Sequence, residues 1–158
     1  MLTREEVLQH VSYDPETGIF TRLKSVHKFR IGKAAGFVSH SGYGVVIIGN
    51  YRFYAHRLAW LIMTGEQPQV VDHINRNPTD NRWVNLRNGT QAQNTANAGP
   101  SKNNKTGFKG VSLSDGKYRA TLMFNRRQIW LGYHDTPEAA SEAYKAKAKE
   151  LWGEYANA

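Results

Sequence analysis

The hydrophobic positions of this chain change their period several times. Short runs rich in β-branched and aromatic residues, separated by turn formers, fill residues 13–54 and predict an antiparallel β-meander. The spacing then becomes helical over residues 55–64, and Gly65 is suited to end that helix. A shorter helix is expected near the start of the chain, where Thr3 and Glu6 form a capping box.

The central part of the chain predicts two strands followed by a helix. The apolar pair at residues 70–71 indicates a strand that continues into an Asp-His pair, and an Asn-rich loop follows it. A second strand is expected around residues 83–87. Thr90 then caps a helix, with Gln93 completing the capping box.

The last third of the chain predicts a sheet with one helix. Strict alternation over residues 117–124 gives one apolar face and one polar face, as in a half-buried strand. A further β run covers residues 126–133, and Thr136 with Pro137 begins a helix rich in alanine. With another short β run after residue 107, this predicts a three-stranded antiparallel sheet packed on one C-terminal helix. The fold class expected for the whole chain is α+β.

A change in composition divides the chain. Residues 99–106 are small, polar and basic and lack apolar periodicity, which is typical of a linker. We therefore expect an N-terminal domain over residues 1–98 and a C-terminal domain over residues 107–158. A chain of 158 residues is long enough to form two small lobes, each with its own core.

The charge balance indicates a polyanionic partner. The formal net charge is +8 and the sequence pI is about 9.8, with basic residues mixed among aromatic ones, which favours nucleic acid over a membrane surface. Together with the motifs below, the expected partner is double-stranded DNA. The chain contains no cysteine, so disulfides and thiolate zinc sites are excluded. Any metal would need oxygen or imidazole ligands, so Mg²⁺ or Mn²⁺ is expected and zinc is not. The lack of a long apolar run predicts a soluble, intracellular protein.

The Asp-His pair has the chemistry for phosphodiester hydrolysis. Strand alternation points Asp72 and His73 to different sides, so a metal and a base can act on opposite sides of phosphorus. His73 is suited to deprotonate water because its ordinary pKa, about 6.5, lies close to working pH. Asn94, near the start of the following helix, is a second oxygen ligand for a magnesium site with Asp72. Asn85 is expected to orient His73 or to tie the loop, and Arg87 to bind phosphate.

The segments D-H-I-N, D-N-R, N-L-R and the closing Q-N together resemble the HNH endonuclease family, in particular its homing-endonuclease branch. The residues of the family's name fall on His73, Asn85 and Asn94. This resemblance implies a ββα-metal fold with Asp72 and Asn94 as metal ligands and His73 as general base. It also implies a mobile-element context, such as a phage whose protein acts in the host cell. The zinc-binding cysteine pairs of some relatives are absent.

The C-terminal pattern G-F-K-G-V, K-Y-R-A and I-W-L-G-Y-H-D-T-P-E-A-A resembles the plant ethylene-response-factor (APETALA-two type) DNA-binding domain. That resemblance implies a sheet docked in the major groove. Ser112, Ser114 and Gln128 stand where the plant domains carry Arg, so the plant target sequence is not expected here. The expected DNA-contacting residues are Lys109, Lys117, Arg119, Thr121, Met123, Arg126, Arg127 and Trp130, and the linker residues Lys102 and Lys105 either track phosphates or are solvated.

These patterns predict a metal-dependent DNA endonuclease whose C-terminal sheet binds the target. A non-catalytic DNA-binding regulator and an RNA-binding or RNA-cutting protein are the alternatives, since basic charge and aromatic residues also permit them. One active site per chain is compatible with a monomer that nicks one strand and with a homodimer that cuts both.

Overall fold

The computed structural model describes residues 2–157, which divide into two compact units between Gly89 and Thr90. Both units combine helices with small antiparallel sheets, and the chain ends in a helix, so the α+β class is confirmed. The division places residues 90–98 with the second unit, whereas the sequence groups them with the first. The functional limits of the two domains stay a prediction.

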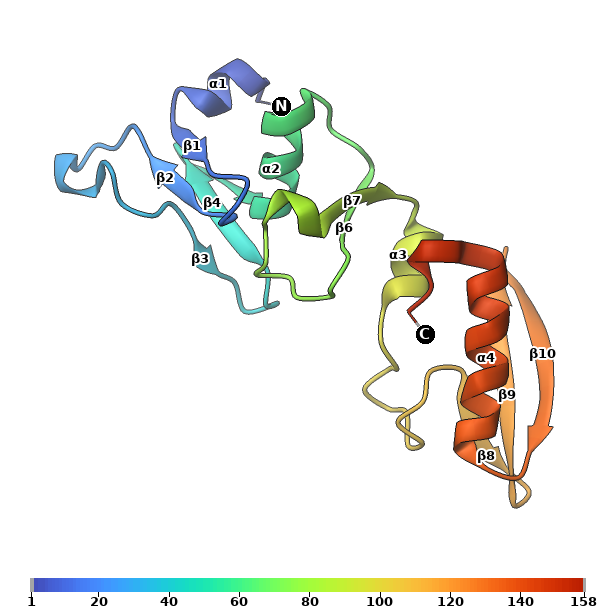
Figure 1. The fold of residues 1–158 in the computed structure, drawn as a ribbon. Coiled ribbons are helices and arrows are strands. Elements are labelled where there is room, and N and C mark those ends of the chain that lie inside the picture. Colours follow the sequence, from blue (N-terminus) through green and yellow to red (C-terminus); the bar gives the residue numbers. More distant parts are fainter. Residues whose placement is uncertain (1, 158) are drawn as a thin grey trace. The chain divides into compact units, whose positions relative to one another are not determined.

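The first unit contains three small sheets and two helices (Figure 1). The sheets pair β1 with β2, β4 with both β3 and β5, and β6 with β7, all antiparallel. The elements are α1 (Arg4–Leu8), β1 (Val11–Tyr13), β2 (Phe20–Arg22), η1 (Lys28–Arg30), β3 (Phe37–Val38), β4 (Gly44–Ile48), β5 (Tyr51–Tyr54), α2 (Ala55–Thr64), β6 (Val70–His73), η2 (Trp83–Asn85) and β7 (Leu86–Gly89).

Two expectations for the first unit are corrected. Residues 13–54 do not form one meander: β1 and β2 make a separate hairpin, and an isolated bridge between Thr21 and Ala34 links β2 to the segment before β3. The long connection between β2 and β3 lacks the alternation that would extend a ladder. The strand expected around residues 83–87 begins at Leu86, because the three residues before it form the 3₁₀ turn η2.

The core of the first unit forms where α2 packs on α1, β4 and β5. Leu58, Leu61 and Ile62 lie at helical spacing and are buried, and Gly65 ends α2 with a left-handed φ of 79°. The capping box of α1 is formed as its sequence predicts.

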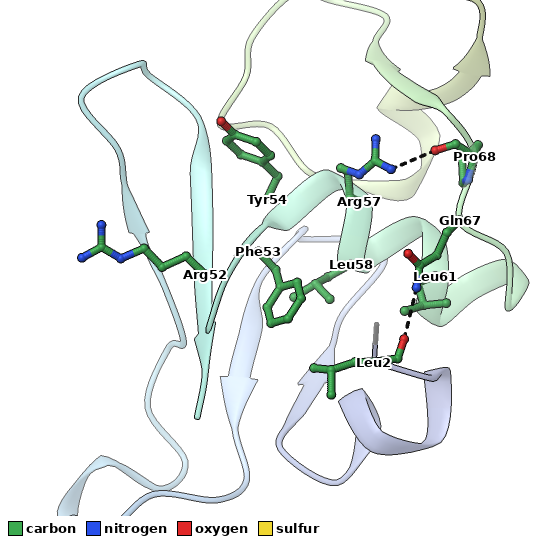
Figure 2. Close-up of a pocket in the computed structure, with 9 residues that line it drawn as sticks. All are labelled: Leu2, Arg52, Phe53, Tyr54, Arg57, Leu58, Leu61, Gln67 and Pro68. Atoms are coloured by element: carbon green, nitrogen blue, oxygen red, sulfur yellow. Dashed lines mark hydrogen bonds between the residues drawn. The ribbon is translucent and has the colours of Figure 1, made fainter. Parts of the chain in front are cut away.

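A cavity of about 190 Å³ lies in the first unit beside the start of α2 (Figure 2). Arg57 donates to the carbonyl oxygens of Pro68 and Gln69, both at 3.0 Å, which fixes one wall. The nine described residues that line the cavity include no carboxylate.

The second unit is a helix followed by a three-stranded antiparallel sheet and a longer helix, with strand order β10-β9-β8. Both hairpins turn through two residues with positive φ, as type I′ turns require: Asp115 with Gly116, and Asn125 with Arg126. The elements are α3 (Gln91–Asn97), β8 (Val111–Ser114), β9 (Lys117–Phe124), β10 (Arg127–His134), α4 (Pro137–Trp152) and η3 (Gly153–Tyr155).

Helix α4 covers one face of this sheet. Ala120 and Leu122 of β9 and Tyr144 of α4 are buried, whereas alternate residues of β9 are more exposed, as predicted. Gly110 lets the sheet approach α4, because a Cβ there would lie 2.2 Å from the ring of Tyr144. Thr136 and Pro137 begin α4, also as predicted.

Among residues 2–157, no helix is long and apolar enough to cross a membrane.

Candidate active site

Strand β6 carries the Asp-His pair into the interior of the first unit. Asp72 is 5% exposed and His73 is 6% exposed. The register with β7 pairs Asp72 with Arg87 and His73 with Leu86. Because neighbouring residues of a strand point to opposite faces, the carboxylate and the imidazole have different surroundings.

Arg87 binds the carboxylate of Asp72 across the two strands. Its Nε and one terminal nitrogen both lie 2.9 Å from Asp72 Oδ2. This pair holds the carboxylate in one orientation. A contact of Arg87 with substrate phosphate stays a prediction.

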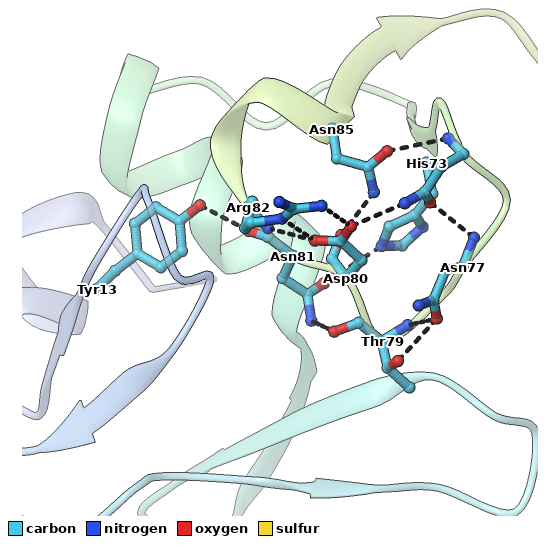
Figure 3. Close-up of polar contacts among 9 residues, drawn as sticks. Tyr13, His73, Asn77, Thr79, Asp80, Asn81, Arg82 and Asn85 are labelled. Carbon is cyan, nitrogen blue, oxygen red and sulfur yellow. Dashed lines mark hydrogen bonds and ion pairs between the residues drawn. The ribbon is translucent and has the colours of Figure 1, made fainter.

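The ring of His73 is oriented by Asn81, in the loop after β6 (Figure 3). Asn81 Nδ2 donates to the carbonyl oxygen of Thr79 at 3.1 Å, which leaves Asn81 Oδ1 facing His73 Nε2 at 3.3 Å. An amide oxygen only accepts, so Nε2 carries the ring proton and the lone pair is at Nδ1. The loop therefore selects one tautomer of the imidazole.

Asn81 is itself held by the N-terminal part of the unit. The hydroxyl of Tyr13 donates to the backbone oxygen of Asn81 at 2.7 Å (Figure 3). Burial, with the nearby Asp14 and Asp80, raises the pKa of Tyr13 to about 12, so this donor keeps its proton. Gly18 lies directly against the backbone of Asn81, where a Cβ would approach within 2.6 Å.

Asn85 ties the loop between β6 and β7. Its Oδ1 accepts from the backbone N–H of Asn75 at 2.9 Å, and its Nδ2 donates to the backbone oxygen of Asp80 at 2.7 Å (Figure 3). The carboxylate of Asp80 also accepts from Arg82 and Asn75, and the hydrogen bond from Arg82 is the main reason that its pKa lies below the usual range. Asn85 was expected either to orient His73 or to tie the loop, and these contacts tie the loop.

His56 on α2 packs against the ring of His73. The two ring centroids are 4.9 Å apart in an edge-on arrangement, and Tyr54 stacks on His56 at 5.6 Å. His56 is 7% exposed, and within the described residues its Nδ1 has no hydrogen-bond partner. Burial, with repulsion from His73 and Arg57, lowers its pKa to about 3. His56 is therefore a neutral aromatic neighbour of His73 at physiological pH.

The protonation of His73 suits a proton acceptor. Burial holds its pKa below the ordinary value, although the Asn81 hydrogen bond and the carboxylates of Asp72 and Asp80 act in the opposite direction. The imidazole is therefore neutral near neutral pH, which is the form that can take a proton from water.

The remaining predicted site residues lie in the second unit. Asn94 is the fourth residue of α3, whose capping box is formed as predicted. Lys109 donates to three backbone oxygens at the end of α3, those of Thr95, Ala96 and Ala98. Lys109 thus caps the C-terminal end of α3. Its contact with DNA stays a prediction.

The outer face of the sheet in the second unit carries most of the other predicted DNA contacts. The register aligns Trp130 with Thr121 and places Arg119 beside Ser112. Trp130 is 64% exposed and Met123 is 57% exposed, whereas Lys117 pairs with Asp135 at 3.3 Å. The other exposed cations are Arg126 and Arg127 in and after the second hairpin turn, and Lys102 and Lys105 in the segment before the sheet.

The residue types predicted for the metal site, a carboxylate and an amide, are types that can bind magnesium. No group of three or more His, Cys, Asp or Glu side chains that could hold a metal occurs in residues 2–157. Magnesium needs fewer protein ligands, because water and substrate phosphate complete its shell. Asp72 on β6 supplies a buried carboxylate. A carboxylate with an amide oxygen suits Mg²⁺ or Mn²⁺ rather than zinc.

Comparison with known proteins decides the family. Residues 53–96, from β5 to α3, match the family model described as HNH endonuclease. An uncharacterized HNH endonuclease of Acanthamoeba polyphaga mimivirus is 34% identical over 131 residues, which cover 80% of this chain and 67% of that protein. The chain belongs to the HNH endonuclease family. "Protein 3.8" of Escherichia phage T7 is 30% identical over 105 residues, 64% of this chain and 86% of that protein. No solved structure matches this HNH endonuclease.

The match to the HNH model covers all five residues predicted for catalysis and metal binding, and it also covers His56 and Asn81. The site predicted from the sequence includes neither His56 nor Asn81. Both side chains contact His73 in this HNH endonuclease. The Asn-rich loop could have indicated Asn81, but the sequence contains several equivalent Asn residues there and no signal that separates them.

Proposed function

We propose that this HNH endonuclease is a divalent-metal-dependent enzyme that hydrolyses phosphodiester bonds of duplex DNA, with His73 as the general base. The observation that carries the proposal is the neutral, buried imidazole whose Nε2 faces the amide oxygen of Asn81. That contact turns Nδ1 into the proton acceptor. Family membership supports the nuclease reaction, and the viral relatives support a phage-type context.

In this mechanism His73 Nδ1 takes a proton from the water that attacks phosphorus. Asn81 and His56 keep the imidazole plane fixed, so little reorganisation is needed when the water arrives. Arg87 keeps the carboxylate of Asp72 oriented. Asp72 and Asn94 are the residues that would hold Mg²⁺ or Mn²⁺, and the ion would stabilise the leaving oxygen and orient the phosphate.

Metal removal is the direct test. Supercoiled plasmid incubated with the protein and Mg²⁺ or Mn²⁺ should be converted to nicked or linear DNA, and EDTA should abolish the conversion. Gel separation of the three plasmid forms reports nicking and double-strand cleavage together. Equal cutting in EDTA would contradict the metal requirement. Duplex binding without cutting in either metal would favour the regulator instead.

The outer face of the β8-β9-β10 sheet is proposed to bind the DNA target. Its support is the exposed Arg119 and Trp130 on neighbouring strands, on the face away from α4. An exposed Trp beside cations is costly as a solvated surface and suits contact with DNA. The resemblance to the plant DNA-binding domain supports the same face, and a homing-endonuclease function would follow from selective binding there.

Replacing Arg119 with Ala should weaken duplex binding about tenfold, since a base contact contributes roughly 1–3 kcal/mol. Fluorescence anisotropy in EDTA would measure the Kd without cleavage. Lys149→Ala on α4 is the matched control, because it removes one exposed cation from the helix that covers the other face. Equal Kd values for the two variants would show that the outer face of the sheet does not contact the DNA.

A further inference from the structure

The excess positive charge is divided evenly between the two units. Residues 1–89 hold eleven Lys and Arg against seven Asp and Glu, and residues 90–158 hold ten against six. The cations of the first unit are unevenly distributed along the chain. Residues 17–65 contain seven Lys and Arg and no Asp or Glu. The sheet of the second unit therefore accounts for only part of the basic surface.

Two of these seven cations donate to backbone carbonyl oxygens, and Lys24 donates to the side-chain amide oxygen of Gln9 at 3.3 Å. Arg22 donates to the carbonyl oxygen of Ile47 at 3.3 Å, and Arg57 forms the cavity wall described above. The other five are exposed, and within the described residues none of them forms an ion pair with a carboxylate. These five cations are Lys24, Lys28, Arg30, Lys33 and Arg52.

Four of the five cations lie on the connection between β2 and β3, residues 23–36. This connection extends away from the small sheets of the unit and contains η1 (Figure 1). Its large apolar side chains are also exposed: Val26 is 97% exposed and Phe29 is 72% exposed. The guanidinium carbon of Arg30 lies 5.6 Å from the centre of the Phe29 ring. An unburied apolar residue next to cations without carboxylate partners indicates a contact surface rather than a core segment.

The fifth cation, Arg52, lies on the outer face of the β3-β4-β5 sheet. It is paired with Ile47 in the register, and its guanidinium lies 6.0 Å from the ring centre of Phe37. Tyr54, two residues further along β5, points to the same face and is 46% exposed. We call the five cations together with Phe37 and Tyr54 the basic face.

The basic face ends at the catalytic residues of the same unit. Tyr54 stacks on His56, and His56 lies edge-on against His73. Tyr43 contacts Tyr54, His56 and His73 with centroid distances of 5.5, 5.6 and 6.2 Å. A continuous series of rings therefore connects the exposed Arg52 strand to the imidazole of His73.

We propose that the basic face binds the phosphate backbone of duplex DNA and leads the duplex to His73. This rests on the proposed endonuclease function and adds a DNA-binding surface in the catalytic unit itself. Cations without carboxylate partners release counterions when they neutralise phosphates, which provides affinity without reading sequence. The five cations of the basic face match that requirement, and the position of His73 at the end of the face favours a nucleic acid over a lipid surface.

The triple variant Lys28→Ala/Arg30→Ala/Lys33→Ala tests the proposal. Each residue is exposed, so the fold should persist, and a circular dichroism melt would verify it. The Kd for a short labelled duplex, measured in EDTA, should rise tenfold or more, and the slope of log K against log salt should fall by about 2 to 3, at roughly 0.9 per phosphate contact.

Lys145→Ala/Lys147→Ala/Lys149→Ala is the matched control. It removes three positive charges from α4, where Lys145 and Lys147 pair with Glu142 and Glu150. If the two triple variants have the same Kd and salt slope, total charge explains the binding and the basic face is excluded. Stronger competition by structured RNA than by duplex DNA would also overturn the assignment. If the wild type fails to cut plasmid but its DNA binding is still weakened by the triple substitution in the basic face, only the endonuclease function is refuted.

Discussion

The variant His73→Ala should lose cutting of supercoiled plasmid by about two to four orders of magnitude in kcat, because a general base typically contributes that much. DNA binding should be retained, since the exposed cations lie on other elements. The loss follows from geometry: the neutral imidazole is the group whose tautomer Asn81 fixes and whose ring His56 supports. Single-turnover cutting in Mg²⁺, beside anisotropy in EDTA, separates the chemical step from binding.

A buried imidazole also contributes to packing, so a second variant is needed. His73→Gln keeps a polar side chain beside Asn81 and fills more of the space, but a neutral amide cannot accept the proton of the attacking water. It should fold and bind duplex DNA like the wild type and still fail to cut. Near wild-type cutting by His73→Gln would show that another group is the base.

Local signals in the sequence predicted the local structure correctly. The capping boxes at Thr3 and Thr90, the left-handed Gly65 and the alternation of residues 117–124 each depend on neighbours within a few positions, and all are present in the structure. The single meander expected over residues 13–54 was wrong, because the pairing of distant strands is decided by the connection between them.

The sequence predicts which residue types form the candidate site, and it does not predict their contacts. The chemistry of Asp72 and His73 can be read from their adjacency, and burial of both fits it. Their partners could not be read in this way. Asn81 is one of several Asn residues in its loop, and its orientation depends on Thr79 and on Gly18 from a distant turn. The contact between His56 and His73 likewise depends on how α2 packs beside β6.

Gly18 provides a test of this distant support. Its φ is +73°, and a Cβ would lie 2.6 Å from the backbone nitrogen of Arg82 and from the carbonyl carbon of Asn81. Gly18→Ala should therefore lower the free energy of unfolding by on the order of 2–4 kcal/mol, from left-handed strain together with overpacking. The displaced Asn81 would no longer fix the His73 ring, so kcat should fall at temperatures where the variant remains folded.

Gly65→Ala separates the two contributions, because Gly65 has a similar φ of +79° and a Cβ there would meet no atom of the described residues within 4 Å. Only the strain remains there, so the loss of stability should be about 1 kcal/mol and plasmid cutting should be unchanged. Thermal unfolding and cutting rates measured side by side give the comparison.

Equal effects of the two variants would mean that contact between the turn and Asn81 does not position His73. A larger stability loss for Gly18→Ala with an unchanged kcat would mean that this contact stabilises the fold but does not affect catalysis. If kcat falls for Gly18→Ala and not for Gly65→Ala, the turn that contains Gly18 helps to position His73.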